Sequence, residues 1–143
     1  MSTQTSHSKM IGQRGELLAE LFLEDLGAKF VARSEIPHFP YDLVMGFTTS
    51  TGGINIYAVE VKATEQPISS QYPLPRRSAD SITKSNIPVL LLVVDVKRNR
   101  LYYALGPSVA QVAASQAGRQ TVMVPVTEID EHIKRELQAK LTS

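Results

Sequence analysis

The sequence predicts an α/β fold, with a central mixed β-sheet flanked by helices. The ten residues 87–96 are apolar except for Asp95 and rich in β-branched side chains, which is typical of a strand buried on both faces. A hairpin pattern over residues 41–63 precedes that strand, and helical patterns lie towards both ends of the chain. The resulting order, α, β, β, β, α, β, β, α, β, α, indicates one sheet covered by helices.

The composition indicates one globular domain that spans residues 11–143, after a disordered N-terminal tail at residues 1–10. The 143 residues are 43% hydrophobic and 20% charged, which is enough apolar material for a core. No apolar run is long enough to span a membrane or to form a signal peptide, so we expect a soluble, cytoplasmic protein without a membrane partner. The absence of cysteine excludes disulfides and thiolate chemistry, so any metal must have oxygen or imidazole ligands.

Strong helix formers at residues 11–26 predict a first helix that ends at Gly27 and packs extensively against the sheet. Residues 29–34 are expected to form a short strand. Pro37 and Pro40 then favour an extended, irregular segment before the hairpin.

The hairpin is expected to consist of strands at residues 41–47 and 54–63, joined by the Thr- and Gly-rich turn at residues 48–53. The two prolines and the polar residues within 64–75 favour a loop. A short polar helix is expected at residues 76–86.

Three elements are expected after the central strand: a strand at residues 101–105, a helix at residues 107–117 and a short strand at residues 121–126. Thr127 is a candidate N-cap for a final helix. The apolar stripe of that helix consists of Ile129, Ile133, Leu137 and Leu141.

Three charged residues stand out within the hairpin. Side chains alternate along a strand, so Glu60 and Lys62 share one face. The hairpin can place Asp42, in the preceding strand, beside Glu60. Charges on apolar strands are costly unless they are paired, metal-bound or at the rim of a cleft. The simplest alternative to a metal site is an ion pair in which Lys62 bridges the two acids.

The metal hypothesis accounts for all three residues together. Two carboxylates on neighbouring strands supply the hard oxygen ligands that Mg²⁺ prefers, while the ion keeps several waters. Such an ion polarises a phosphate and lowers the pKa of an attacking water. Lys62 is then placed to orient that water or to offset the charge of the transition state.

The triplet PYD that ends at Asp42, followed after 17 residues by EVK at residues 60–62, resembles the signature of PD-(D/E)XK nucleases, with Tyr41 inserted between Pro and Asp. Over residues 11–96 the chain is most similar in pattern to archaeal Holliday-junction resolvase-like domains. The resemblance implies a restriction endonuclease-like core and Mg²⁺- or Mn²⁺-dependent hydrolysis of DNA, without an organic cofactor. It also implies metal ligands from Asp42, Glu60 and the backbone carbonyl of Val61.

In the family that the chain resembles, a glutamate early in the first helix approaches the same metal. Glu16 holds the matching place, eleven residues before Gly27. It lies beside Ala19 and Leu23 on the apolar side of the helix, which favours a functional acid. The alternative is an ordinary acid that interacts with the helix dipole.

Arg76, Arg77 and Lys84 form the best local basic cluster for contacts to the DNA backbone. The alternative is an ordinary solvated helix. The net charge of +1 gives little overall attraction to a polyanion, so such a local patch is needed. His38 is expected to be a surface residue. One small domain offers one site, so cutting both strands of a duplex requires a homodimer or successive nicks.

Two other functions remain open from the sequence. The first is a fold relative that binds nucleic acid or a protein without cutting, for which the acids and the lysine would be structural. The second is a defence or toxin nuclease that acts on RNA, because the sequence gives no sign of how a 2′-hydroxyl would be recognised.

Overall fold

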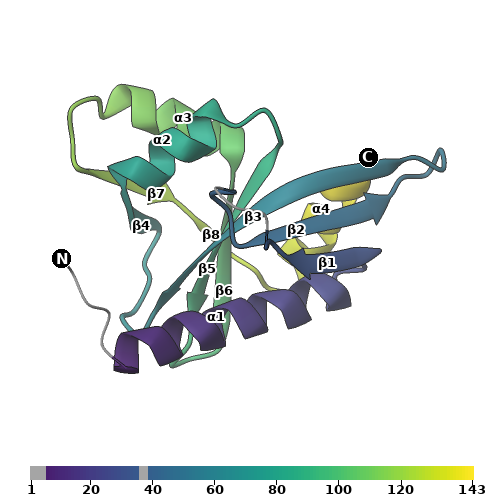
Figure 1. Ribbon diagram of the computed structural model, residues 1–143, viewed down its shortest axis with the longest axis horizontal. Helices are drawn as coiled ribbons and strands as arrows, with labels where there is room; N and C mark the ends of the chain where they lie inside the picture. Colours follow the sequence, from purple (N-terminus) through teal and green to yellow (C-terminus); the bar gives the residue numbers. More distant parts are fainter. Residues whose placement is uncertain (1–5, 36–38) are drawn as a thin grey trace.

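A six-stranded mixed sheet forms the centre of the computed structural model, which describes residues 6–35 and 39–143 (Figure 1). Only the β3 and β5 neighbours are parallel, and the other neighbouring strands are antiparallel. This arrangement confirms the predicted α/β class with a mixed sheet. In spatial order the strands are β1 (Phe30–Arg33), β2 (Leu43–Thr48), β3 (Ile54–Thr64), β5 (Val89–Asp95), β6 (Arg100–Leu105) and β8 (Thr127–Glu128).

Helices cover both faces of the sheet. One apolar core lies between the sheet and the pair α1 (Ser6–Asp25) and α4 (Glu131–Thr142). The other lies between the sheet and a layer that contains α2 (Arg76–Lys84) and α3 (Gly106–Ser115). Figure 1 shows α1 on one side of the sheet and the α2 and α3 pair on the other. Every residue of β5 is buried, as predicted for a strand between two cores.

The first helix differs from its prediction in two ways. It begins at Ser6, so residues 6–10, which were assigned to the N-terminal tail, are helical. It also packs along one face only. Gly15, Ala19 and Leu23 are buried, and Ile11, Leu18 and Phe22 are partly buried against the same core, whereas Leu17 and Leu21 are 51% and 55% exposed. The predicted packing of α1 against the sheet is therefore confirmed for this face, and the apolar residues on the other side of the helix stay exposed.

The segment expected to be a loop at residues 64–75 contains a strand, β4 (Gln71–Pro75), which pairs antiparallel with β7 (Thr121–Pro125). The prolines misled the prediction. The backbone bonds to β7 that flank this segment involve Ser70 and Arg76. Because N–H groups alternate sides along a strand, Pro73 and Pro75 occupy positions whose missing N–H faces away from β7.

The final helix begins three residues later than Thr127 would have capped it. Asp130 is the N-cap, and its carboxylate accepts a hydrogen bond from the backbone N–H of Ile133 at 2.8 Å. Thr127 instead lies in β8, where it pairs with Tyr103 of β6. The predicted stripe is confirmed, since Leu137 and Leu141 are buried and the two isoleucines pack against the same core.

Pro37 and His38 lie outside the described residues. Among the residues that are described, no helix is both long and apolar enough to cross a membrane.

Candidate active site

Asp42 ends the ladder between β2 and β3. The last paired residues are Leu43 and Val59, and the register continued by one step places Asp42 opposite Glu60. The backbone N–H of Asp42 donates to the carbonyl of Val59 at 3.1 Å, while its Oδ2 accepts from the backbone N–H of Val61 at 2.8 Å. The Asp42 carboxylate thus takes the place of a backbone carbonyl as the acceptor for the Val61 N–H. This bond fixes the Asp42 carboxylate beside Glu60.

Glu60 is an acid buried among apolar neighbours, with 8% of its surface exposed. Burial above all, together with a hydrogen bond with Asp42 and the negative charge of Asp42, raises the pKa of its carboxyl to about 8. The positive charge of Lys62 and the backbone N–H of Val61 act in the opposite direction. The Lys62 charge and the Val61 N–H therefore do not fully offset the negative charge that the Asp42 and Glu60 carboxylates carry when both are ionised.

Glu16 approaches Asp42 from α1. Burial raises the pKa of the Glu16 carboxyl, and so do the charge of Asp42 and a hydrogen bond with it. Arg33 lies 3.9 Å from Glu16 and 2.6 Å from Glu20, and its charge lowers the pKa of Glu16. Asp42 is the residue that both glutamates contact, so the three acids are arranged in a row with Asp42 at the centre.

A glycine allows α1 to bring Glu16 this close. A Cβ atom at Gly15 would lie 2.5 Å from the Cβ of Ala63 in β3, far inside normal contact distance. Any larger residue at position 15 would therefore push α1 away from the sheet. Sequence reasoning did not assign this role to Gly15, and its only local signal was a glycine inside a helical pattern.

Lys62 lies on the same face of β3 as Glu60, as predicted. Ala58 packs in the core on the α2 side of the sheet, whereas Val59 and Val61 belong to the core on the α1 side. Lys62 borders two hollows. One, of about 370 Å³, is lined by Pro40, Glu60, Lys62, Arg77, Ser78 and Ser81. The other, of about 470 Å³, lies towards the start of α1 and is lined in part by Gly12, Thr64 and Glu65.

The donors available for a metal are few. Within residues 6–35 and 39–143, no three His, Cys, Asp or Glu side chains are arranged to hold one ion. The carboxylates of Asp42 and Glu60 remain, together with the Val61 carbonyl, which points to the same strand edge as the Val61 N–H. Two carboxylates and a carbonyl suit Mg²⁺ or Mn²⁺, which keep several waters. The unrelieved charge of the acidic pair also favours a cation, so these residues fit the ion.

Arg76 does not point its charge at the site. Its guanidinium donates to the backbone carbonyls of Arg119 at 2.8 Å, Ala113 at 3.2 Å and Gln116, and it lies 3.4 Å from Asp80. These bonds tie α2 to the C-terminal end of α3. Arg76 was predicted to contact DNA, but this geometry assigns it a structural role.

The other two basic residues of the predicted cluster face open space. Arg77 lines the hollow that contains Glu60 and Lys62. Lys84 lines a neighbouring hollow of about 450 Å³, which also contains Phe39 and Pro40. The structure thus places Arg77 at the acidic site and Lys84 further along α2.

Tyr41, the residue inserted between Pro40 and Asp42, has a structural role that the sequence did not show. Its ring is buried at 7% exposure, and its hydroxyl donates to the backbone carbonyl of Ser81 at 2.8 Å. Tyr41 therefore fastens the segment before Asp42 to α2.

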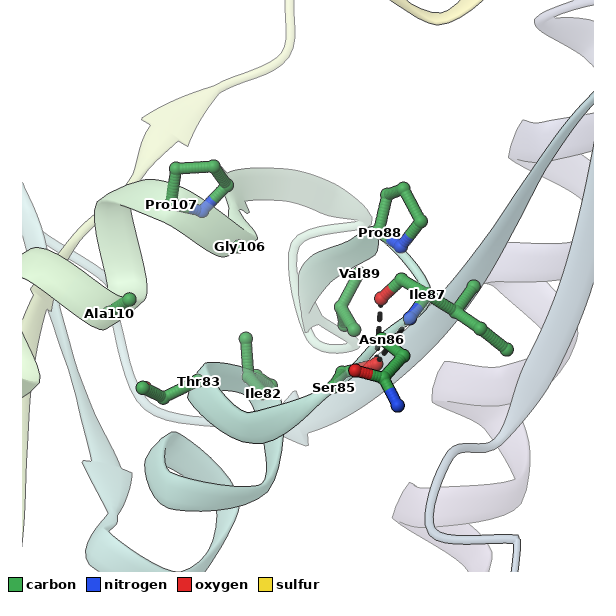
Figure 2. A pocket seen from close by; sticks show the side chains of 10 residues that line it. All are labelled: Ile82, Thr83, Ser85, Asn86, Ile87, Pro88, Val89, Gly106, Pro107 and Ala110. Atoms are coloured by element: carbon green, nitrogen blue, oxygen red, sulfur yellow. Dashed lines mark hydrogen bonds between the residues drawn. The ribbon is translucent and has the colours of Figure 1, made fainter.

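A separate cavity of about 350 Å³ adjoins the end of α2 and the start of α3 (Figure 2). Among the described residues that line it there is no acid, base or histidine. The lining residues are Ile82, Thr83, Ser85, Asn86, Ile87, Pro88, Val89, Gly106, Pro107 and Ala110. None of the predicted site residues borders this cavity.

The fold and the site define an α/β protein in which a buried glutamate, a partly buried aspartate beside it, a third acid and a lysine lie where the pairing of β2 with β3 ends. No protein-family model matches the chain, and no curated protein matches it in sequence.

Proposed function

We propose that this protein is a metal-dependent endonuclease that hydrolyses DNA phosphodiester bonds and has a restriction endonuclease-like core. The observation that carries the proposal is the pair of neighbouring carboxylates of Asp42 and Glu60, of which Glu60 lines a solvent-accessible hollow together with Lys62.

The order of elements supports the same proposal. The PD-(D/E)XK resemblance runs through a first helix, a short strand, the Asp strand, the Glu and Lys strand and a buried apolar strand. The chain has α1, β1, β2, β3 and β5 in that order, and all four strands lie side by side in one sheet. This agreement in the order of elements supports the proposed fold, whereas the acids and the lysine support the proposed chemistry.

Each site residue has a role under this proposal. Asp42, Glu60 and the Val61 carbonyl hold Mg²⁺ or Mn²⁺, which when bound polarises the phosphate and lowers the pKa of water. The Lys62 ammonium orients the attacking water and offsets negative charge that develops on the phosphate. Glu16 contacts Asp42 and holds its carboxylate from the α1 side. Arg77, at the rim of the hollow, is placed to contact the phosphate backbone.

The structure disfavours the simpler ion-pair explanation. In the described part of the chain, no ion pair joins Lys62 to Asp42 or to Glu60, although the charge of Lys62 does act on Glu60. A lysine that only neutralised the acids would make direct contact with them. Lys62 faces the hollow instead.

Cleavage of labelled DNA tests the proposal. Purified wild type, Asp42→Ala and Lys62→Ala are compared on duplexes, single strands and branched junctions, and on RNA, with Mg²⁺, Mn²⁺ or EDTA. We expect metal-dependent cutting of DNA by wild type that falls at least about a hundredfold in both variants. Lys140→Ala, which removes an exposed lysine on the opposite face of the sheet, is the matched control and should cut normally.

Three results would reject the proposal or part of it. No cutting of any substrate by folded wild type would favour a binding module. Cutting that persists in Asp42→Ala would place the activity elsewhere. Cutting of RNA but not of DNA would show that the substrate is RNA and not DNA. Sedimentation of wild type with a duplex would show whether two strands are cut by a homodimer or by successive nicks.

A further inference from the structure

We propose that a groove along α2 binds an unpaired DNA strand beside the scissile phosphate. This inference rests on the proposed nuclease function and specifies its substrate. The α2 groove consists of the two hollows of about 370 and 450 Å³, which share Pro40 and Ser81 as lining residues. It extends from Glu60 and Lys62 at one end to Ile87 at the other.

The width of the α2 groove is fixed by contacts within the fold. One wall is α2, and the other is the segment at residues 39–41. The Tyr41 hydroxyl bonds to the Ser81 carbonyl at 2.8 Å, which joins the two walls at the base. The ring of Phe39 stands edge-on to Tyr41 with a centroid distance of 5.5 Å, which supports the second wall. A preformed groove binds a ligand without a large ordering cost.

The α2 wall carries groups that suit phosphates. Arg77 and Lys84 are seven residues apart, so they lie on the same side of the helix. Both are exposed, and within the described residues neither side chain forms a hydrogen bond or an ion pair. The hydroxyl-bearing side chains of Ser78 and Ser81 line the space between them. Basic and hydroxyl groups in a row are the usual contacts to a nucleic-acid backbone.

The opposite wall suits bases. Phe39 is half-buried, Pro40 is exposed, and Ile87 at the far end is 39% exposed. In a duplex the flat faces of the bases are stacked on one another, so such a wall has little to contact. An unpaired strand offers those faces to aromatic and apolar side chains. The pairing of a basic wall with an apolar wall therefore indicates an unpaired strand.

The other hollows fit this ligand less well. The one on the far side of Lys62 is lined by Glu65, whose carboxylate lies 2.6 Å from His7. Under the proposed function Glu60 would face a bound metal, whereas Glu65 would present its negative charge to a phosphate. Among the described residues that line the cavity in Figure 2, no side chain carries a charge. The α2 groove alone among these three combines Arg77, Lys84 and an apolar wall.

Fluorescence anisotropy in EDTA tests the inference without requiring cleavage. A labelled single strand, its duplex and the RNA strand of the same sequence are titrated with wild type, Lys84→Ala and Phe39→Ala. We expect wild type to bind the DNA single strand more tightly than the other two. Phe39→Ala should weaken that binding roughly tenfold through the loss of one stacked base. Lys84→Ala should lower the salt dependence by the equivalent of about one phosphate contact.

Two further variants keep the test sharp. Arg135→Ala removes an exposed arginine from α4, on the opposite face of the sheet, and should bind like wild type. Phe39→Trp keeps a stacking surface and should retain binding, which separates a lost contact from a damaged wall. Thermal unfolding of each variant confirms that the protein is folded.

Several results would overturn the inference. Duplex or RNA bound at least as tightly as the DNA single strand would do so. Binding that is unchanged in both Lys84→Ala and Phe39→Ala would also overturn the groove inference. If wild type still cut DNA in that case, the nuclease proposal would stand. Conversely, groove-dependent binding by a wild type that never cuts would reject the nuclease and leave the groove in place.

Discussion

Two cavities of nearly equal size adjoin α2, and their linings differ in kind. The hollow beside Glu60, at about 370 Å³, is bordered by one acid and two basic residues. The cavity in Figure 2, at about 350 Å³, is bordered within the described residues by apolar and neutral polar side chains. Volume alone would not separate them. The charges that the fold concentrates at the first cavity, at a cost in stability, are what identify a site for chemistry.

The difference follows from where each cavity lies. The charged hollow lies beside the start of β2, where the Asp42 side chain replaces a backbone partner of Val61 and an acid takes part in the pairing of the strands. The cavity in Figure 2 lies where α3 begins. There Gly106 approaches the carbonyl of Val89 so closely that a Cβ would be 3.2 Å from it. The first is formed by chemistry-bearing side chains and the second by close backbone packing.

The largest expected effect comes from removing the buried charge with Glu60→Gln. The pKa of Glu60 is raised from an ordinary 4.5 to about 8, so the folded state binds its proton more tightly than the unfolded state. Wild type therefore loses stability as pH rises between about 4.5 and 8. Each pH unit in that window is worth up to about 1.4 kcal/mol. The variant lacks this loss and should be more stable than wild type by a few kcal/mol above pH 8, with no gain below pH 4.5.

Thermal unfolding from pH 4 to pH 9, with and without Mg²⁺, measures this effect. Metal should raise the unfolding temperature of wild type at pH 8 and leave that of Glu60→Gln nearly unchanged, since the carboxylate ligand is gone. If the unfolding temperatures of the two proteins changed with pH in the same way, the pKa of Glu60 would not be raised in the folded state. The hollow beside Glu60 would then not differ from the cavity in Figure 2 in this respect.

An intermediate effect is expected from the glycine that positions α1. Gly15→Ala introduces a methyl group against Ala63, and the overpacking should cost about 1 to 3 kcal/mol of unfolding free energy. Cleavage should fall as well, because Glu16 moves with the helix. Gly12→Ala on the same helix meets no atom within 4 Å and should stabilise the protein by roughly 0.5 to 1 kcal/mol.

Chemical denaturation of the two glycine variants gives the comparison, and Ala63→Gly in the Gly15→Ala background is the rescue. Equal stability of Gly15→Ala and Gly12→Ala would mean that α1 is not held at the distance that brings Glu16 to Asp42.

The smallest effect is expected at the cavity in Figure 2. Thr83→Ala removes a hydroxyl whose one hydrogen bond among the described residues is to the carbonyl of Ala79, one helical turn earlier. Unfolding free energy should change by less than about 0.5 kcal/mol, and cleavage and metal response should match those of wild type. A loss of cleavage in this variant, with stability intact, would show that the uncharged cavity takes part in function.

The elements that were predicted correctly depend on patterns within a few residues. The apolar run of β5 and the alternation of β3 are local, and they led to the central sheet and to the shared face of Glu60 and Lys62. The elements that were missed depend on distant partners. β4 is stabilised by β7, about fifty residues later, and the depth at which α1 packs depends on Gly15 meeting Ala63.

The candidate site shows the same division. Asp42, Glu60 and Glu16 were named from spacing and from a family resemblance, and the structure brings their carboxyls into contact. The basic cluster was named from composition, which could not reveal that the donors of Arg76 bond to α3 carbonyls. Neither could it show that Tyr41 anchors to α2. The sequence alone does not distinguish a side chain that stabilises the fold from one of the same residue type that faces a ligand.

The bonds of Arg76 also set an order of assembly during synthesis. The hairpin with Asp42 and Glu60 leaves the ribosome before α2, and α2 is fixed in place through carbonyls that follow later still, at Ala113, Gln116 and Arg119. The β4 strand just before α2 likewise waits for β7. A nascent chain therefore carries its acids well before the wall beside them is in position, and the complete site forms only after β7 has been synthesised.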